Sequence, residues 1–445
     1  MELDLNQKEE YKKTELGLLP NEWEVVRLGD VVQKMKAGGT PKRGIKEYWN
    51  GEIPFALIED ITSCGLYLSK TKNTITEEGL KNSNAWIVPE NSLLLSMYAT
   101  IGETAINTIP LATNQAILAI IPKGNFDKVF GAYLLKFNAE RLKMQNIQST
   151  QKNVNKGIVE SFKIPVPPLS EQKKIAYVLS SVQEAKEKTE DVIKASKELK
   201  KSMMNHLFTY GLVSLEEAEK VPLKETEIGL IPEEWEVMRL GDLFKSKNII
   251  IQFGFPCGKW NDKGLGVPHL RPFNVSNDGQ VVLNGLKFIN IERDINKYLL
   301  KKGDILFNNT NSEELVGKTA YWNKDGDFVL SNHMTIIRVL NFNLINSQFL
   351  ANYLHKKWYD GFYLKICRRH VNQASISLAR LEQIQIPLPP LSEQQKIASI
   401  LSAIDQKIEA EENKKKALED LFKSLLHNLM TAKIRVNDLE NVFDE

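Results

Sequence analysis

The sequence predicts an α+β protein that carries one plan twice: two mixed α/β domains of shared fold, separated by two long antiparallel helices that form a coiled coil. Two repeats predict this pseudo-twofold plan. Residues 164–176 read IPVPPLSEQKKIA and return at 386–398 as IPLPPLSEQQKIA. Residues 15–25 return in the same way at 227–237. The stretches between the repeats differ, so we expect a shared frame around two dissimilar domains.

The domain boundaries follow from the repeats. A chain of 445 residues is too long for one ordinary core. We expect a first mixed domain, a first spacer helix, a second mixed domain, a second spacer helix and a C-terminal tail. These cover 1–168, 169–212, 213–390, 391–432 and 433–445, respectively.

The composition excludes several classes of protein. No run of 18 apolar residues is present, so we expect no membrane span. Cys64, Cys257 and Cys367 lie far apart, which predicts a reduced, cytoplasmic protein without disulfides. Neither the cysteines nor the six histidines have metal-ligand spacing, so we expect no metal site.

The spacer helices begin after the proline pairs of the repeat. Proline is excluded from a helix interior, and Ser170 and Ser392, two residues after the pairs, are good N-caps. Glu171 and Glu393 follow in the first turn, where the helix dipole favours a carboxylate. No Gly or Pro interrupts 170–210, so a helix of about 40 residues, roughly 60 Å long, can form.

Apolar residues recur along both helices at heptad spacing, which predicts that the helices pair. The predicted seam consists of Ile175, Leu179, Val182, Ile193, Met203 and Leu207 in the first helix, with Ile397, Leu401, Ile404, Ile408, Leu418, Phe422, Leu425 and Leu429 in the second. Lys186, Lys200, Glu411 and Lys415 interrupt its middle. The alternative is that each helix merely packs on its own domain.

The two mixed domains carry matching strand patterns. Residues 92–98 and 304–308 have the composition of buried strands. The segments that follow them match in pairs, 101–105 with 316–320 and 113–117 with 331–335. We therefore expect one fold with different loops, as is common where specificity diverges on a fixed scaffold.

The charge is distributed unevenly. Residues 24–168 hold 17 Lys and Arg against 13 Asp and Glu, a net charge of +4. Residues 236–390 hold 20 against 13, a net charge of +7. The frame, made of 1–23, 169–235 and 391–445, has a net charge of −3 in each piece. Basic domains attract polyanions, whereas an acidic frame favours contact with protein.

Loops rich in Gly, amide and basic side chains are the candidate DNA contacts. Arg and Lys recognise guanine, Asn and Gln recognise adenine, and other basic side chains hold phosphates. In the first domain the candidates are Lys34, Lys36, Gly38, Gly39, Thr40, Lys42, Arg43, Tyr98, Thr100, Asn114, Gln115, Gln151, Lys152 and Asn153. In the second they are Arg271, Asn274, Asn308, Asn309, Asn311, Asn332, His333, Arg368, Arg369, His370 and Gln373. Each has a structural alternative: Gly38-Gly39 can be only a turn, and Asn114 or Asn332 can cap backbone.

Motifs for catalysis are incomplete. Residues 316–319, Val-Gly-Lys-Thr, resemble the end of a phosphate loop, but the earlier glycine position holds Ser312. The proline pairs at 167–168 and 389–390 lack the preceding Asn or Asp and the following aromatic of amino-methyltransferases. We therefore predict no catalytic residue and no enzyme activity for this chain.

These motifs together resemble the specificity subunit of type I restriction–modification systems. The carriers are P-P-L-S-E-Q at 167–172 and 389–394, G-L-[LI]-P-x-E-W-E at 17–24 and 229–236, A-G-G-T-P at 37–41 and T-N-Q-A-I at 113–117. The resemblance implies two target-recognition domains that bind double-stranded DNA in two half-sites. It also implies two methyltransferase subunits docked on the helices and restriction subunits in the full complex. Those partners would bind S-adenosylmethionine, ATP and Mg, so we expect no cofactor on this chain.

Two other functions stay open from the sequence. One is an enzyme in which the specificity function is fused to a methyltransferase or nuclease, which the missing motifs argue against. The other is a protein scaffold that does not touch DNA, which the basic domains argue against.

Overall fold

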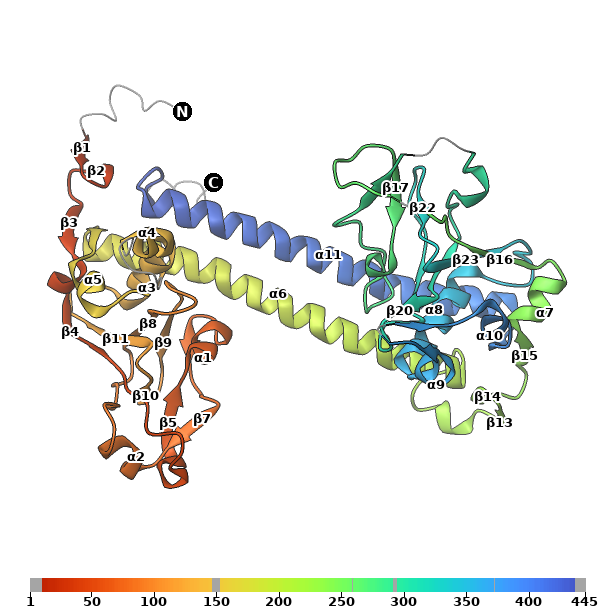
Figure 1. The fold of residues 1–445 in the computed structure, drawn as a ribbon, viewed down its shortest axis with the longest axis horizontal. Coiled ribbons are helices and arrows are strands. Elements are labelled where there is room, and N and C mark those ends of the chain that lie inside the picture. The colour runs from red at the N-terminus through yellow and green to blue at the C-terminus, as the bar shows by residue number, and fades with distance from the viewer. Residues whose placement is uncertain (1–9, 146–152, 258, 291–293, 372, 437–445) are drawn as a thin grey trace. The chain divides into compact units, whose positions relative to one another are not determined.

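The computed structural model describes residues 10–145, 153–257, 259–290, 294–371 and 373–436. By its internal contacts the chain divides into unit 1, Met1–Lys188 with Lys414–Glu445, and unit 2, Thr189–Asn413. Each unit holds one mixed domain and one part of each long helix (Figure 1). We call the mixed domains the first domain, in unit 1, and the second domain, in unit 2.

The elements of the first domain alternate between short strands and short helices. Its strands are β1 (Tyr11–Thr14), β2 (Gly17–Pro20), β3 (Glu24–Arg27), β4 (Val32–Ala37), β5 (Trp49–Ala56), β6 (Tyr67–Leu68), β7 (Asn73–Ile75), β8 (Leu93–Ser96), β9 (Thr104–Asn107), β10 (Ala112–Thr113), β11 (Ile117–Pro122) and β12 (Lys163–Val166). Its helices are α1 (Ile58–Ser63), α2 (Glu77–Lys81), α3 (Lys128–Phe137), α4 (Ala139–Met144) and α5 (Lys156–Ser161).

The core of the first domain lies on both faces of a five-stranded sheet ordered β4-β11-β8-β9-β6. Successive side chains of a strand point to opposite faces. Leu93 and Leu95 of β8 accordingly join one cluster with Phe130 of α3, while Leu94 joins another with Ile61 of α1. This double coverage explains why β8 is a continuous apolar run.

The second domain has the same plan. Its strands are β13 (Leu223–Thr226), β14 (Gly229–Pro232), β15 (Glu236–Arg239), β16 (Ile249–Phe253), β17 (Val267–Leu270), β18 (Lys287–Ile289), β19 (Ile305–Asn308), β20 (Thr310–Asn311), β21 (Thr319–Tyr321), β22 (Val329–Leu330), β23 (Met334–Val339), β24 (Arg368–Arg369), β25 (Ala374–Ser375) and β26 (Gln385–Leu388). Its helices are α7 (Leu240–Lys245), α8 (Ser347–Tyr359), α9 (Phe362–Ile366) and α10 (Leu378–Glu382). The main sheet is ordered β16-β23-β19-β21. Again Ile305 and Phe307 face one cluster and Leu306 the other.

The backbone confirms that the two domains share a fold. Gly102 and Gly317 occupy the same turn, with φ of +92° and +90°, and their N–H groups bond back to the ends of β8 and β19. The match of 113–117 with 331–335 that the sequence predicts is wrong by one residue. Thr113 is equivalent to Leu330, because Thr113 pairs in parallel with the end of β5 and Leu330 pairs in the same way with the end of β17.

The frame contains the long helices α6 (Leu169–Tyr210) and α11 (Leu391–Met430). The carboxylate that opens each helix holds the tryptophan of the upstream repeat. Trp23 Nε1 donates to Glu171 Oε2 at 3.0 Å, and Trp235 Nε1 donates to Glu393 Oε2 at 3.1 Å. Both tryptophans are buried. The two repeated motifs therefore meet in one contact at the start of each long helix.

The glutamine of each repeat is buried and holds three backbone groups. Gln172 Oε1 accepts the N–H of Asp127, the N-cap of α3, at 2.8 Å, and its Nε2 donates to Pro167 and Asn125 carbonyls. Gln394 makes the equivalent bonds in unit 2, including one from Asn346, the N-cap of α8, at 2.9 Å. This amide fixes each domain to the start of its helix.

The long helices pack on each other and on the domains, so the predicted pairing and its alternative both describe part of the contact. The buried seam residues are Ile175, Leu179, Ile193, Leu207, Ile397, Leu401, Ile408 and Leu429; Val182, Met203, Ile404, Leu418, Phe422 and Leu425 are half-buried. Within unit 1, Ile175 and Leu429 belong to the core of the first domain. Within unit 2, Leu207 and Leu401 belong to the core of the second.

Ion pairs join the helices where the apolar seam is interrupted. Lys186 lies 3.8 Å from Glu419 in unit 1. In unit 2, Lys197 lies 2.8 Å from Glu412, and the buried Lys200 lies 2.6 Å from Asp405.

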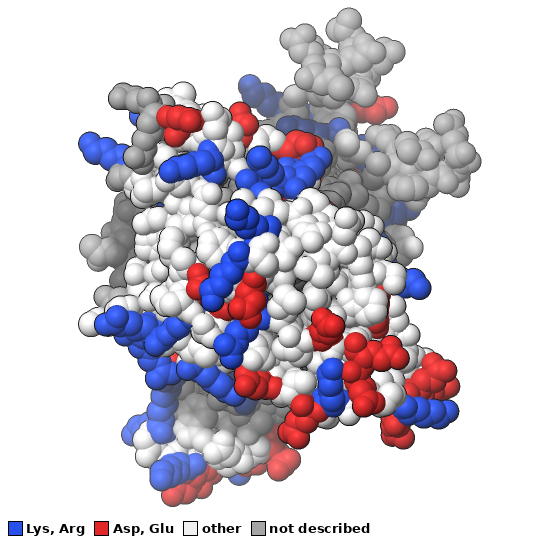
Figure 2. All heavy atoms as spheres, turned by 90° about the vertical axis from the view of Figure 1, so that its right-hand side faces the viewer, with Lys and Arg blue, Asp and Glu red and all other residues white. Residues whose placement is uncertain are grey.

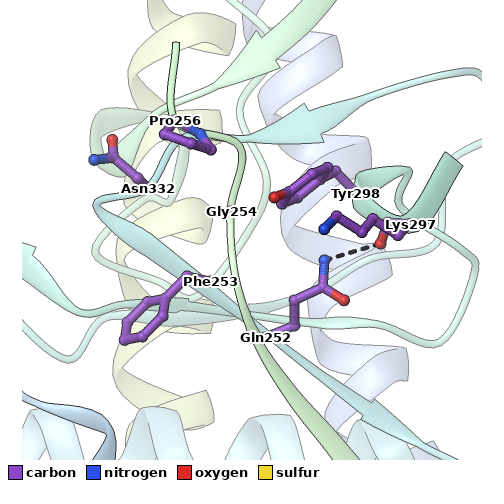
Figure 3. A pocket seen from close by; sticks show the side chains of 7 residues that line it. All are labelled: Gln252, Phe253, Gly254, Pro256, Lys297, Tyr298 and Asn332. Atoms are coloured by element: carbon purple, nitrogen blue, oxygen red, sulfur yellow. Dashed lines mark hydrogen bonds between the residues drawn. The ribbon is translucent and has the colours of Figure 1, made fainter. Parts of the chain in front are cut away.

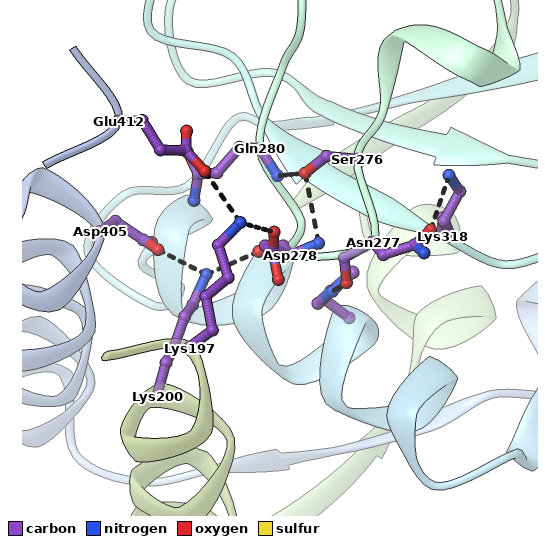
Figure 4. Close-up of polar contacts among 10 residues, drawn as sticks. Lys197, Lys200, Ser276, Asn277, Asp278, Gln280, Lys318, Asp405 and Glu412 are labelled. Carbon is purple, nitrogen blue, oxygen red and sulfur yellow. Dashed lines mark hydrogen bonds and ion pairs between the residues drawn. The ribbon is translucent and has the colours of Figure 1, made fainter. Parts of the chain in front are cut away.

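The second domain is tied to these pairs through one turn. Lys200 Nζ donates to the Asp278 carbonyl at 2.8 Å, and Lys197 Nζ lies 2.8 Å from the Asp278 carboxylate (Figure 4). Burial raises the pKa of Asp405, and the charge of Lys200 opposes that rise. The interrupted seam is thus a charged contact between both helices and the second domain.

Candidate nucleic-acid interface

A glycine turn at the end of the edge strand builds the site in each domain. A Cβ at Gly38 would lie 2.0 Å from the Thr113 carbonyl oxygen, and a Cβ at Gly254 would lie 2.1 Å from the Ser331 carbonyl oxygen. Only glycine permits this close approach of two backbones. Gly38 thus positions the loops as a packing residue, and so does Gly39, whose N–H donates to Thr113.

The first domain gathers basic and polar side chains around this turn. Lys34 and Lys36 of β4 are exposed, and their ammonium groups lie 4.3 and 5.4 Å from the centre of the Trp86 ring. Thr40 Oγ1 donates to Gln115 Oε1 at 2.5 Å across the turn. The quadrupole of the indole ring attracts a cation placed over its face, so Trp86 orders both lysines.

The remaining candidates of the first domain divide by accessibility. Lys42, Arg43, Thr100 and Gln115 are exposed; Thr40, Tyr98, Asn114 and Asn153 are half-buried; Gln151 and Lys152 lie outside the described residues. Asn114 Oδ1 accepts the Ala116 N–H at 3.1 Å, so its amide caps the turn, as the structural alternative states. The exposed members, with Lys34, Lys36, Thr40 and Trp86, are called the first loop surface.

The second domain places an aromatic ring at the position of Trp86. Tyr298 occupies it, beside a hollow of about 580 Å³ (Figure 3). Gln252, at the position of Lys36, donates through Nε2 to the Lys297 carbonyl at 2.9 Å, and the Lys297 ammonium lies 4.9 Å from the Tyr298 ring centre. Asn332 is exposed on the far side of the hollow. Amide, cation and ring thus surround one concave site.

A second group of aromatic and basic side chains lies on the loops around β17. The guanidinium of Arg271 lies 5.5 Å from the Trp260 ring centre and 5.8 Å from that of Phe273. Lys287 lies 4.2 Å from the Trp260 ring centre. Trp260 and Phe273 are each 49% exposed. Exposed rings stacked with cations are typical of nucleic-acid contacts.

The β24–β25 hairpin carries the basic run of the second domain. Arg368, Arg369, His370 and Gln373 are exposed. Arg369 forms an exposed ion pair with Glu313 at 2.6 Å. His370 Nε2 lies 3.2 Å from Ser375 Oγ, which steadies the hairpin. The hairpin, the hollow and the loops around β17 are called the second loop surface; hydrogen bonds of Ser331 to Leu270 and of Thr310 to His333 join them.

Asn274 has a structural role, and we no longer count it among the candidate DNA contacts. It is buried; its Oδ1 accepts the Arg271 N–H at 2.9 Å, and its Nδ2 donates to the Val282 carbonyl at 2.7 Å. Asp60 makes the same cap on Leu57 N–H in the first domain. Both ends of the Asn274 amide are therefore held by backbone.

Asn308 and Asn309 also leave the set, because they are buried at the end of β19. Asn308 Nδ2 donates to the Pro272 carbonyl at 3.0 Å. Asn311 and His333 are half-buried at the base of the hairpin, and Asn311 Oδ1 accepts the Ser312 N–H at 2.8 Å. Amide residues in these strands chiefly hold loops in place.

Sequence reasoning missed Trp86, Gln252 and Tyr298. The signal was present, because Asn84-Ala85-Trp86 aligns with Asn296-Lys297-Tyr298 ahead of the matched strands. An aromatic residue beside a strand is more often part of a core, so this signal alone does not mark a binding site.

The resemblance of residues 316–319 to a phosphate loop has a structural explanation. Lys318 is buried and its Nζ donates to the Val275 carbonyl at 2.5 Å. Burial lowers the pKa of this lysine.

Among the residues that the structure describes, no three His, Cys, Asp or Glu are grouped to hold a metal ion. In the described chain, no helix is both long and apolar enough to cross a membrane.

Charge is separated on the surface of unit 2. On the face in Figure 2, Lys and Arg gather over the upper and left parts, and Asp and Glu gather at the lower right. Residues 213–235 of the frame contain seven Glu against two Lys.

Comparison with known proteins gives the same picture over the whole chain. The sequence matches the family described as the type I restriction modification DNA specificity domain twice, at 20–195 and 232–420. The type I restriction enzyme MjaVIII specificity subunit of Methanocaldococcus jannaschii is 31% identical over 97% of this chain and 98% of its own length. The MjaIX specificity subunit of the same organism is 27% identical over 97% and 98%.

Solved structures share the fold. The S subunit of a type I restriction-modification system from M. genitalium aligns with a TM-score of 0.59 at 17% identity, over 92% of this chain and 97% of that one. A chain from a study of type I R-M complex assembly aligns with a TM-score of 0.55 at 18% identity, over 94% and 99%.

The duplicated domain, the paired helices and the full-length relatives lead to one assignment. The chain belongs to the specificity subunits of type I restriction–modification systems, the non-catalytic subunits that give these enzymes their DNA specificity.

Proposed function

We propose that this subunit recognises an asymmetric, bipartite DNA target, one half-site with each loop surface. The observation that carries the proposal is the equivalence of Trp86 and Tyr298. The two domains share a backbone yet present different side chains beside the same glycine turn: two lysines over an indole in one, and an amide, a lysine and a phenol in the other. Unlike side chains at equivalent positions favour unlike half-sites.

The bases between the half-sites would go unread. Two reading domains on one side of a duplex are about one helical turn apart, roughly 10 base pairs from centre to centre. The target therefore has a gap that no side chain contacts, and the length of the frame helices sets that gap.

The frame is the docking surface for partner proteins in this proposal. Two methyltransferase subunits bind the duplicated frame, and restriction subunits join the complete complex. The partners bind S-adenosylmethionine, ATP and Mg, and this chain supplies DNA recognition alone. The acidic charge of the frame supports contact with protein rather than with phosphate.

A salt series on the assembled complex tests the DNA surface. Lys34→Gln with Lys36→Gln should lower affinity for the mapped target and reduce the slope of log K against log salt by about one unit for each lost phosphate contact. Lys423→Gln, an exposed lysine of α11, is the control and should change neither quantity. Equal effects of the two variants would exclude the first loop surface as a DNA contact.

A further inference from the structure

The start of each frame helix forms an acidic corner, and the described chain closes the two corners differently. In unit 1, Arg435 crosses the start of α6. Its Nε donates to Glu171 Oε1 at 2.8 Å, its Nη2 donates to Glu171 Oε2 at 2.9 Å, and it also pairs with Glu22. Val436 is buried in the core beside it. The corner in unit 1 therefore binds an arginine followed by an aliphatic residue.

The equivalent corner in unit 2 is hollow. By the repeat, Glu234 stands for Glu22, and Glu393 for Glu171. A cavity of about 600 Å³ lies against both, lined also by Leu212, Val213, Val221, Pro222 and Pro232. Among the described residues, no arginine lines this cavity. The unit 2 corner thus has the carboxylates of its counterpart, and part of its aliphatic wall comes from the segment that follows α6.

The course of the chain explains the difference. After α6 the backbone turns at Gly211, with φ of +75°, and the Leu212 N–H donates to Glu393 Oε1 at 3.3 Å. That neutral donor takes one of the oxygens that Arg435 binds in unit 1. The charged residues that line the cavity are two lysines and four glutamates: Lys220, Lys396, Glu217, Glu233, Glu234 and Glu393. The lining therefore has a net negative charge.

We propose that this corner binds an arginine side chain, flanked by aliphatic residues, from a protein partner. The segment would lie beside Leu212 at the start of α11, in the cavity between Glu234 and Glu393. The two carboxylates would bind the guanidinium in the bidentate geometry that arginine favours. This inference rests on the proposed docking of partner subunits on the frame. It makes the two docking surfaces unequal, because one corner is closed by Arg435 and the other is open.

A peptide that copies the chain's own filled corner tests the site without any partner. The peptide Thr-Ala-Lys-Ile-Arg-Val, residues 431–436, is titrated into the full chain by calorimetry. We expect saturable binding of one equivalent, with a Kd of about 1 mM or lower. Glu234→Gln should abolish this binding. Arg435→Gln leaves Val436 in the core, so the unit 1 corner stays covered and the stoichiometry should remain one.

Controls separate a lost site from a lost fold. Circular dichroism and thermal unfolding must match the unaltered chain, and a peptide with Gln in place of its arginine should not bind. Absence of binding to the unaltered chain, or binding that Glu234→Gln leaves intact, overturns the proposal.

The same variants in a pull-down with the methyltransferase subunit distinguish this site from the proposed function. If the unaltered chain captures two methyltransferase copies and Glu234→Gln weakens the capture of one at least tenfold, the corner is a partner site. If Glu234→Gln has no effect on a normal complex, the arginine site is wrong while frame docking stands. If the unaltered chain captures no methyltransferase, the proposed docking itself is wrong.

Discussion

At the residue scale, the side chains of both loop surfaces are arranged around aromatic rings. Trp86 lies under two lysines and Tyr298 beside one, so each ring orders the cations that we propose to contact DNA. A ring that orders charged side chains lowers the entropy lost when those side chains bind DNA.

The rings provide the first prediction. Trp86→Ala in the assembled complex should weaken binding to the target by about 1–3 kcal/mol and relax discrimination in one half-site only. Tyr298→Ala should do the same in the other half-site. The measurement is a competition binding assay against targets altered in one half-site at a time. Phe342→Ala, which removes an exposed aromatic of the second domain outside both loop surfaces, should leave affinity unchanged. A loss of discrimination in both half-sites from one substitution would contradict the assignment.

The hairpin arginines provide the second prediction. Arg368→Ala should reduce the salt slope by about one unit, as expected for one lost phosphate contact. Arg369→Ala should have a smaller effect, because Glu313 already neutralises part of its charge. Glu313→Gln should strengthen binding at low salt by freeing that arginine. An unchanged slope in Arg368→Ala would make the hairpin a structural feature.

Residue type alone could not distinguish an asparagine that contacts DNA from one that caps the backbone of a loop. Asn274 and Asn308 were plausible base readers, because an amide that recognises adenine has the same donor and acceptor as one that caps backbone. Only burial and the positions of Val282 and Pro272 decide their role. The exposed Lys42, Arg43, Arg368 and Arg369 were predictable, because a run of cations is rarely accommodated in a core.

At the element scale, the frame is specified by contacts that the sequence repeats. The start of both long helices was predictable from the proline pairs. The structure begins the helices at Leu169 and Leu391, so Ser170 and Ser392 lie inside the first turn and are not the predicted N-caps. The contacts of Gln172 and Gln394 were not, because their partners in α3 and α8 lie in the dissimilar domains. The ion pairs across the seam also depend on a helix register that heptad spacing alone leaves open.

The buried Lys200–Asp405 pair provides the third prediction. Lys200→Met should destabilise unit 2 by about 3–5 kcal/mol, because it leaves a buried carboxylate without its cation. Lys200→Met with Asp405→Leu should recover most of this loss. Thermal and urea unfolding measure both. Lys423→Met, at an exposed position of α11, is the control.

The pH dependence of the single variant has a defined sign. Burial raises the folded-state pKa of Asp405 above its unfolded value, and removal of Lys200 raises it further. A raised carboxyl pKa contributes stability below the unfolded pKa, and that contribution is lost as the pH rises through the folded pKa. The destabilisation by Lys200→Met should therefore be smaller near pH 4 than near pH 8. A destabilisation independent of pH would show that the loss arises from packing.

At the scale of the whole molecule, the duplicated fold gives one chain two loop surfaces, which is the arrangement that the proposed bipartite recognition requires. The shared sheets and glycine turns preserve the position of each loop surface, while the loops themselves differ in side chains and length. Sequence comparison of the halves was sufficient to predict the shared fold. The one-residue error at 113–117 arose because the matching polar letters are offset from the equivalent backbone positions.

The most direct test of the two-reader account is a domain exchange read out by methylome sequencing. Residues 236–385 are replaced with the corresponding segment of another specificity subunit, and the methylated sites of cells carrying each version are mapped. The account predicts that one half-site changes, while the other half-site and the length of the unread gap stay the same. A single continuous palindromic target, or an exchange that rewrites both half-sites, would contradict it.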